Sequence, residues 1–573
     1  MTKIFDKPEE FAATGLRAFN HIFQDVVRPV AGGALRAISG RKGKVTLLVG
    51  GGSGHYPTFC GYVGEGFADA VVMGDVFASP STKSVLDIAR IAHCGGGIVM
   101  GFGNYAGDNL NFGIAAERLR AEGIDTRIVT TTDDVASAPS DAHRKRRGVA
   151  GDIVVFKIMG AAADDGIDID GVEKIGWLAN DQTRSFGVAF DGCTLPGESD
   201  KLFHVAEGRM ALGLGIHGEP GIAEMDFAKP SEIARLMFER VVGEAPVSSS
   251  RVAVVLNGFG STKLEELFVL WAELEPLFSA KGLTIVAPLV GEYATSLDMA
   301  GCSLTVTWLD ETLERYWRAP VNSPALRRPL IETEWVPMNA QHVERVEPTY
   351  AVEPSAVGRA AGACVGKALE ALASALAEAE ERLGKIDAAA GDGDHGQGMA
   401  RGSSAAAEAA KKAVAAGAGP ETVLAAAADA WAERAGGTSG ALWGEGLRAF
   451  SSELDDAATP TAHALRQGVR RMYERITQIG KAKPGDKTIV DALAPFVETF
   501  ESALGDGQPL VKAWQRAAEA AEAAAQATKD LMPGLGRAKT HGKASLGHPD
   551  AGAISMALSA EVIGSFLSTK ISK

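Results

Sequence analysis

Three aspartates in the C-terminal half of the chain have the type and spacing of ligands for a hard metal ion. Asp387 closes a predicted helix, and Asp392 and Asp394 follow in the glycine-rich loop GDGDHG. This spacing allows three carboxylates to converge, and an all-oxygen ligand set favours Mg²⁺, which is commonly shared with substrate phosphates. An EF-hand is excluded because Gly396 and Ser403 occupy its fifth and twelfth ligand positions. The alternative is an acidic surface turn.

Three further glycine-rich loops in this half could hold the phosphates of a nucleotide. GGTSG at 436–440 opens a predicted helix, so backbone N–H groups and two hydroxyls face any anion bound there. GKAKPGDKT at 480–488 is not a P-loop, because an aspartate occupies the lysine position and the preceding segment is helical. The last loop, 534–553, contains Arg537 and Asp550. Together with the aspartates, these loops indicate nucleotide phosphates held between helices through divalent ions.

The N-terminal half contains three motifs that could bind and activate a small polar molecule. GGGSGH at 50–55 does not match G-x-G-x-x-G, and indicates either a backbone nest for a small ligand or a glycine-rich turn with a structural histidine. Asp108 follows a predicted strand, where it could accept a proton from a substrate hydroxyl or cap a turn or helix. His217, in GIHGEPG with Glu219 two residues on, could serve as acid, base or nucleophile.

The elements around these motifs predict an α/β unit over residues 1–320. Short apolar runs, rich in β-branched residues, are typical of buried strands, and they occur at 44–50, 96–103, 125–134 and 251–260. Amphipathic helical stretches lie between them, and this alternation predicts parallel sheets covered by helices on both faces. Ligands in such sheets bind beyond the carboxyl ends of the strands.

The remainder of the chain predicts a linker and a second domain. Residues 318–354 contain six prolines and no glycine, which is typical of an interdomain linker; we place it at 321–354. From 355 to 573 alanine, glutamate and leucine recur at helical spacing, in roughly eight segments and without a convincing strand. This part is predicted to be an all-α domain.

Composition and charge exclude several classes of protein. The content of 46% hydrophobic and 23% charged residues is that of a globular protein, and the net charge of −15 argues against non-specific nucleic-acid binding. The five cysteines lack CxxC spacing, so a disulfide framework or zinc site is not expected. The N-terminus has no signal-peptide pattern, and no run approaches the roughly 18 apolar residues that span a bilayer. We therefore expect a cytoplasmic protein without membrane or nucleic-acid partners.

In this order, the motifs resemble those of the dihydroxyacetone kinase family in its single-chain, ATP-dependent form, over essentially the whole chain. GGGSGH, NYAGD and GIHGEPG are similar to the family's ketose-binding domain, and GDGDHG, GGTSG, GDKT and GHPDAGA to its helical nucleotide-binding domain. The resemblance implies a ketose-binding α/β domain of two subdomains and an eight-helix barrel with the nucleotide at one end. It also implies a homodimer whose small-molecule partners are a ketose and ATP.

The resemblance further implies roles for residues of the ketose site. His217 matches the histidine that forms a covalent hemiaminal with the substrate carbonyl. His55 and Asp108 match the acid/base pair around the bound sugar. The glycine-rich loop is implied to line the same pocket, through Gly52, Ser53 and Gly54.

At the nucleotide site the resemblance implies a metal-bound ATP. Asp387, Asp392 and Asp394 match the ligands of Mg²⁺ ions, two in number, that bridge the phosphates. The loops around the nucleotide contribute Gly437, Thr438, Ser439, Arg537, Asp550 and Gly552.

Three positions depart from the family pattern and bear on the substrate. Tyr56 stands where dihydroxyacetone enzymes usually have glutamate, Gly103 where a lysine is common, and Lys543-Ala544 where an acidic–arginine pair is usual. The first two border the implied sugar pocket, where Gly103 would open space for an extra carbon bearing a hydroxyl.

We therefore predict a phosphotransferase that phosphorylates a primary hydroxyl of a short ketose. Erythrulose, D or L, is preferred over dihydroxyacetone or another short ketose such as apulose. The alternatives from other classes are an FAD–AMP lyase that forms cyclic FMN and a non-catalytic ketose sensor.

Overall fold

The chain forms two compact units, Met1–Val336 and Pro337–Lys573. The computed structural model describes residues 2–38, 41–219, 221–247, 249–329, 354–389, 391–535 and 545–571. Most of the predicted linker, 321–354, lies outside these residues, and the predicted domain limits stay a prediction.

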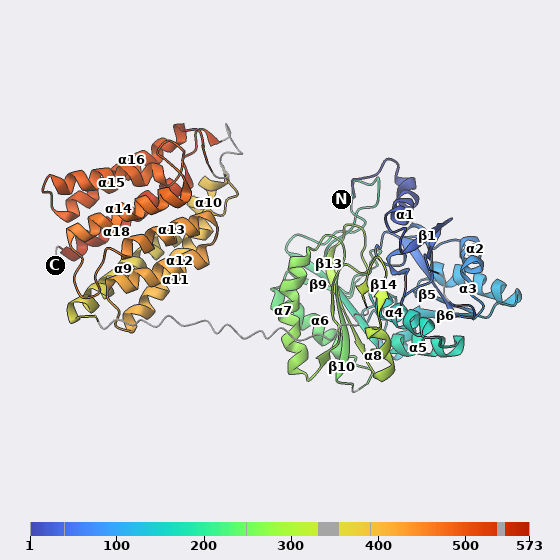
Figure 1. The fold of residues 1–573 in the computed structure, drawn as a ribbon. Coiled ribbons are helices and arrows are strands. Elements are labelled where there is room, and N and C mark those ends of the chain that lie inside the picture. Colours follow the sequence, from blue (N-terminus) through green and yellow to red (C-terminus); the bar gives the residue numbers. More distant parts are fainter. Residues whose placement is uncertain are drawn as a thin grey trace. The chain divides into compact units, whose positions relative to one another are not determined.

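The first sheet of the N-terminal unit has six strands in the order β1-β2-β4-β3-β5-β6 (Figure 1). Its strands β4, β3, β5 and β6 are parallel, as predicted, and an antiparallel hairpin of β1 and β2 lies at one edge. The strands are β1 (Val27–Val30), β2 (Gly33–Arg36), β3 (Thr46–Ser53), β4 (Ala70–Val76), β5 (Ile98–Gly103) and β6 (Thr126–Thr131).

The second sheet has seven strands and is mostly antiparallel, which corrects the prediction of parallel sheets throughout. β10 pairs antiparallel with β13, and parallel only with the short β11 and β12. Both β10 and β13 are buried almost throughout, so their sequences are continuous apolar runs. Parallel strands have the same pattern, which is why a parallel sheet was predicted here. The strands are β7 (Thr183–Asp191), β8 (Arg209–Leu212), β9 (Ala223–Asp226), β10 (Arg251–Gly258), β11 (Thr284–Ile285), β12 (Leu289–Gly291) and β13 (Ala300–Trp308).

Helices cover the outer faces of both sheets, and one helix is buried between them. α2 and α3 pack on the first sheet and α6 and α7 on the second. α4 (Gly151–Asp164) shares a core with Val49 of β3 and Val255 of β10, and 13 of its 14 residues are buried. The other helices are α1 (Phe11–Ile22), α2 (Thr82–Ala92), α3 (Ala106–Ala121), α5 (Ile169–Asp181), α6 (Pro230–Val242), α7 (Leu264–Ala280) and α8 (Glu311–Arg318).

The C-terminal unit consists of helices, as predicted, and its described residues contain no strand. Eight helices have 15 residues or more, and the nine-residue α10 follows α9. The helices are α9 (Ala356–Glu378), α10 (Glu380–Ala388), α11 (His395–Ala415), α12 (Pro420–Ala435), α13 (Gly437–Ser451), α14 (Ala462–Gly480), α15 (Val490–Gly505), α16 (Leu510–Ala527) and α18 (Ala551–Ile571).

Small residues let these helices pack closely. Trp431 of α12 and Trp443 of α13 stack with ring centroids 5.1 Å apart and planes at 14°. Gly402 of α11 lies against this pair, since a Cβ there would meet Trp431 Nε1 at 2.7 Å. The helices also enclose a cavity of about 350 Å³ lined by apolar side chains.

Two of the described helices, α9 and α18, are long and apolar enough to span a membrane by length and composition. The sequence did not predict these two helices as long apolar runs, because alanine and glycine make up much of each helix. Both helices contribute residues to the core of the helical unit, and α9 contacts α11, α12 and α18. The core helix of a soluble protein passes the same test of length and composition, so these two helices are weak evidence for a membrane span.

Candidate active site

A small, partly open cavity lies at the carboxyl end of the first sheet, where loops of the second sheet supply one wall. His55 follows β3, Asp108 lies in the first turn of α3, and the loop between β8 and β9 carries His217. The cavity measures about 30 Å³, enough for about two water molecules. The fold thus brings together Gly52, His55, Asp108 and His217, four predicted residues of the ketose site from three separate segments.

Two histidines face each other across this cavity. His55 Nε2 and His217 Nε2 are 2.9 Å apart, with their rings nearly perpendicular. Nδ1 of His55 lies 2.7 Å from the carbonyl oxygen of Thr295, which can only accept, so that nitrogen carries a proton. Nδ1 of His217 lies 2.9 Å from a carboxylate oxygen of Glu219 and carries a proton for the same reason. The contact between the two Nε2 atoms needs a third proton, so the pair has one positive charge.

Glu219 compensates this positive charge and fixes the ring of His217. Its two oxygens accept hydrogen bonds from Nδ1 and from the backbone N–H of His217, at 2.9 and 3.0 Å. Burial opposes ionisation of Glu219, but the hydrogen bond and charge of His217 lower its pKa to about 2. Burial and the charge of His217 lower the pKa of His55 to about 3. Nε2 of His217 is therefore the atom presented to the cavity.

Asp108 presents an unpaired carboxylate oxygen to the same cavity. Its side chain is buried, and Oδ1 has no hydrogen-bond partner. Burial raises the pKa of Asp108, and a hydrogen bond with Ser79 and the charge of His217 offset part of that rise. A buried acceptor without a partner is costly in a folded protein. A substrate hydroxyl that donated to Oδ1 would satisfy it, and its proton could then be abstracted there.

The glycine-rich loop contributes backbone rather than side chains to the cavity. Gly52 lines it, whereas Ser53 and Gly54 do not. The Ser53 hydroxyl instead donates to the carbonyl oxygen of Gly74 at 2.7 Å, and Gly54 adopts a φ of 99° in the turn. There is no room for a side chain at Gly52, because a Cβ there would meet the backbone nitrogen of Ala78, after β4, at 2.8 Å.

Tyr56 and Gly103, two departures from the family pattern, were both predicted to border the sugar pocket, and only Gly103 does so. Tyr56 does not line it; the ring is 49% exposed and lies edge-on to Phe19. Gly103 lines the cavity as expected, and a Cβ there would lie 3.1 Å from the ring of Tyr105; that it opens space for the substrate stays a prediction. Tyr105 also packs edge-on against His217, with centroids 4.9 Å apart. Gly103 therefore makes room for a tyrosine that supports His217.

In the helical unit the three predicted metal ligands lie together. Carboxylate oxygens of Asp387, Asp392 and Asp394 are all within 4.8 Å of one another, at the junction of α10 and α11. Oδ2 of Asp387 accepts hydrogen bonds from the backbone N–H groups of Gly393 and His395, at 2.9 and 3.4 Å, which fixes the loop. An all-oxygen set of this charge fits a hard divalent cation such as Mg²⁺.

Hydrogen bonds connect this loop to two other predicted nucleotide segments. The buried His395 lies 2.9 Å from Ser555 Oγ of α18 through Nε2, and 3.3 Å from Ser439 Oγ of α13 through Nδ1. Ser439 follows Gly437 and Thr438 at the start of α13, where both neighbours are exposed. The N-terminus of α13 is therefore held beside the aspartates.

Asp550 and Gly552 begin the last helix beside the GDKT loop. Oδ1 of Asp550 accepts from the N–H of Ala553 at 2.7 Å, and a Cβ on Gly552 would meet the same oxygen at 3.1 Å. Burial raises the pKa of Asp550 to about 7, with Asp491 and Asp387 adding to the rise and Lys487 opposing it. The predicted Arg537, together with Lys543 and Ala544, lies outside the described residues.

Sequence reasoning missed four residues of these sites. The sequence placed Glu219 near His217 and Tyr105 in the motif NYAGD, but it predicted no role for either residue. His395 lies inside GDGDHG, in which only the aspartates were predicted to have a role. Asp152, in the first turn of α4, lines the histidine cavity although nothing in its local sequence marks it. Only the fold places it there.

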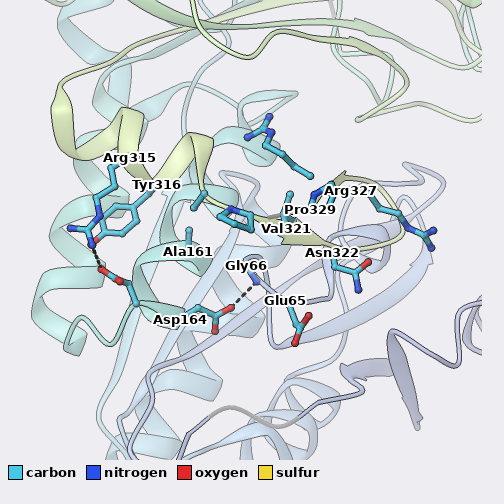
Figure 2. A pocket seen from close by; sticks show the side chains of 14 residues that line it. Glu65, Gly66, Ala161, Asp164, Arg315, Tyr316, Val321, Asn322, Arg327 and Pro329 are labelled. Carbon is cyan, nitrogen blue, oxygen red and sulfur yellow. Dashed lines mark hydrogen bonds and ion pairs between the residues drawn. The ribbon is translucent and has the colours of Figure 1, made fainter. Parts of the chain in front are cut away.

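A larger pocket of about 670 Å³ lies elsewhere in the N-terminal unit, lined by residues of α4, α8 and the segment after α8 (Figure 2). Two of its three acidic groups, Asp164 and Asp165, are already paired. Asp164 accepts a hydrogen bond from the N–H of Gly66 at 2.7 Å and forms an ion pair with Arg36, and Asp165 pairs with Arg315. These pairings are structural, and the histidine cavity is the better candidate for chemistry.

Comparison with known proteins matches both halves of this geometry. The Dak1 domain matches residues 19–325, which hold the histidine cavity, and the DAK2 domain matches residues 389–565, which hold Asp392, Asp394 and the loops around them. The fold and the two sites define a two-domain protein of the Dak1–DAK2 type. The chain belongs to the dihydroxyacetone kinase family, in the form that combines both domains in one chain.

Full-length relatives are similar throughout. A D-erythrulose kinase of Mycolicibacterium smegmatis is 48% identical over 98% of this chain and 98% of its own. An L-erythrulose kinase of Pectobacterium atrosepticum is 47% identical over 99% of this chain and 97% of its own. The crystal structure of the dihydroxyacetone kinase from C. freundii in complex with AMP-PNP and Mg²⁺ has a TM-score of 0.59 and 29% identity, and covers 98% of this chain and 99% of that one.

Proposed function

We propose that this protein is an ATP-dependent kinase that phosphorylates a primary hydroxyl of a short ketose, with erythrulose as the preferred substrate. The observation that carries the proposal is the chain Glu219–His217–His55, which presents a histidine nitrogen to a cavity beside the unpaired oxygen of Asp108. The two erythrulose kinases that are 47–48% identical over nearly the whole chain support the choice of ketose.

The first step captures the ketose covalently on His217. As the sugar enters, the two Nε2 atoms separate and the shared proton passes to His55. The lone pair of His217 Nε2 forms a C–N bond to the carbonyl carbon, and the π electrons of the carbonyl move to its oxygen. That oxygen takes the proton from His55, so the product is a hemiaminal. The positive charge ends on the alkylated ring of His217, beside Glu219, where it began.

This capture explains selectivity by chemistry rather than by shape. A ketone or an aldehyde can form a hemiaminal, whereas an alcohol such as glycerol cannot. The tether also holds the primary hydroxyl at a fixed place, and positioning of this kind supplies much of the rate of phosphoryl transfer.

The second step transfers the phosphoryl group of ATP to that hydroxyl. Asp108 accepts the hydroxyl proton while the substrate oxygen bonds to the γ-phosphorus and the bond to the ADP oxygen breaks. The segments at the start of α13 and α18, which contain Gly437, Thr438, Ser439, Asp550 and Gly552, would surround the nucleotide.

Asp387, Asp392 and Asp394 would hold the Mg²⁺ that accompanies the nucleotide, in line with their all-oxygen donor set. Magnesium neutralises developing charge on the phosphates. That two ions bind is a further part of the proposal. The solved family member with AMP-PNP and Mg²⁺ supports the use of both ATP and Mg²⁺.

We also propose that the protein acts as a homodimer in the cytoplasm, as the family resemblance implies. Sedimentation velocity of the purified chain would test the dimer. A single species with the mass of one chain would contradict it.

The activity is tested by measuring ADP release with Mg²⁺ for D-erythrulose, L-erythrulose, dihydroxyacetone and apulose. We expect the highest kcat/KM for one enantiomer of erythrulose. A higher value for dihydroxyacetone would make this a dihydroxyacetone kinase, and no turnover with any ketose would overturn the kinase proposal. FAD with Mn²⁺ is included, because release of cyclic FMN would reveal the lyase.

A further inference from the structure

A second carboxyl group, that of Asp152, lies in the ketose cavity and has no part in the chemistry proposed above. It projects from the first turn of α4, the helix buried between the two sheets, and the residue is 4% exposed. It lines the same cavity as His55, Asp108 and His217. Its place on a buried helix makes its position rigid.

The contacts of Asp152 leave one carboxyl oxygen for a ligand. The hydroxyl of Thr131, at the end of β6, donates a hydrogen bond to Oδ1. Within the described part of the chain Asp152 forms no ion pair, and Oδ2 accepts no hydrogen bond. This oxygen is therefore available to form a hydrogen bond with a polar ligand in the cavity.

The surroundings of Asp152 favour its neutral form. Burial, and then the negative charges of Asp133 and Asp108, raise the pKa of Asp152 well above its usual range. A neutral carboxyl group carries an O–H donor as well as an acceptor oxygen. Such a group can both donate to and accept from a sugar hydroxyl, which also has both functions.

The proposed chemistry leaves two hydroxyls of erythrulose unassigned, the second primary hydroxyl and the secondary one. The carbonyl is taken by His217 and His55, and the primary hydroxyl that is phosphorylated is taken by Asp108. A four-carbon ketose has in addition a secondary hydroxyl beside the carbonyl carbon. Tyr56 does not line the cavity and Gly103 has no side chain, so neither can form a side-chain hydrogen bond with it.

We propose that Asp152 is a specificity-determining residue, which forms a hydrogen bond with the secondary hydroxyl of a four-carbon ketose while Thr131 holds the other carboxyl oxygen. This inference rests on the proposed kinase function and names the group that selects its substrate. Asp152 acts on substrate choice and takes no proton from the reacting hydroxyl.

The experiment compares two ketoses that differ by this hydroxyl alone, erythrulose and 1,4-dihydroxybutan-2-one. For the wild-type protein we expect kcat/KM to be about 10–100-fold higher with erythrulose, because a hydrogen bond to a matched buried group is lost in the deoxy ketose. Asp152→Ala should lower kcat/KM for erythrulose by a similar factor and leave the deoxy ketose nearly unchanged. Asp152→Asn, which keeps a donor and an acceptor, should retain most of the preference.

Asp170→Ala is the matched control, since this aspartate lies on α5 with a side chain 77% exposed. An equal loss for both ketoses in Asp152→Ala would overturn the inference and make the residue structural. If Asp152→Ala fails to fold by circular dichroism, Thr131→Val replaces it, because it removes the hydrogen bond that holds the carboxyl group. An unchanged preference in Thr131→Val would then overturn the inference. A wild-type protein that phosphorylates neither ketose would instead overturn the proposed function.

Discussion

The ketose cavity and the nucleotide end of the helical unit are built in opposite ways. In the cavity, Glu219, Thr295 and Tyr105 fix both histidines before any substrate arrives. At the nucleotide end, Asp392 and Asp394 are exposed carboxylates that repel each other across less than 4.8 Å. Hydrogen bonds fix the backbone in both regions, but only the nucleotide end gathers carboxylates whose mutual repulsion a bound cation would relieve. Four substitutions test this difference.

The largest effect is expected from Asp394→Asn. It removes one negative charge from the cluster, so phosphate neutralisation fails and kcat falls by about 10³-fold or more. Ketose binding, measured by calorimetry, should persist, because the cavity does not depend on the metal. Glu408→Gln, an exposed carboxylate further along α11, is the control. Activity near that of the wild type at low Mg²⁺ would make the aspartates structural.

His217→Ala should have the next largest effect, through loss of the tether. We expect kcat/KM for the ketose to fall by about 10²–10³-fold, mainly in KM, because the reacting hydroxyl is no longer positioned. ATP binding, followed with a fluorescent analogue, should not change. Ketose kinetics equal to those of the wild type would contradict the hemiaminal.

Glu219→Gln should lower kcat/KM by about 10–100-fold, the usual cost of losing a residue that orients a reactive group. Glutamine keeps the shape but not the charge that compensates the His217 ring. Glu224→Gln on the exposed strand β9 serves as the control. A loss confined to the ATP kinetics would show that Glu219 does not act through His217.

The smallest effect on activity, and a gain in stability, is expected from Lys157→Met. Lys157 is fully buried on α4 and donates to the carbonyl oxygen of Tyr316 at 2.9 Å. Burial, with the charge of Arg328, lowers its pKa from 10.5 to about 7. Between these two pH values the unfolded chain holds a proton that the folded chain has released, so stability rises with pH.

The methionine variant should remove that cost and its pH dependence together. At pH 7 we expect a free energy of unfolding about 1–3 kcal/mol higher, and a flatter profile between pH 7 and 10. Chemical denaturation at several pH values measures both. Lys174→Met, on the exposed face of α5, is the control; a less stable Lys157 variant would mean that the hydrogen bond to Tyr316 outweighs the buried charge.

The parts of the fold that depend on local pattern were predictable from the sequence. GGGSGH and Asp108 could be found because each follows a predicted strand. Asp387, Asp392 and Asp394 could be found because they lie at a loop between alanine-rich helices. Local pattern does not show the direction of a buried strand, so the antiparallel pairing of β10 with β13 was missed.

The roles of residues that act through space were less predictable. The contact of Gly103 with the ring of Tyr105 was not foreseen, because it depends on how the loop after β5 folds back. Tyr56 was expected beside the sugar, yet its ring lies against Phe19. Asp152 reaches the cavity only because α4 is inserted between two sheets, a long-range feature that no short motif encodes.

The stacked indoles of Trp431 and Trp443 give the helical unit an optical signal of its own. Two aromatic transitions at 5.1 Å couple, and the coupled pair produces a paired positive and negative band in circular dichroism. The two residues belong to α12 and α13, which are joined at Gly436, so the signal would respond to any change in the angle between these helices. Nucleotide binding can thus be followed without a label, and separately from events in the ketose cavity.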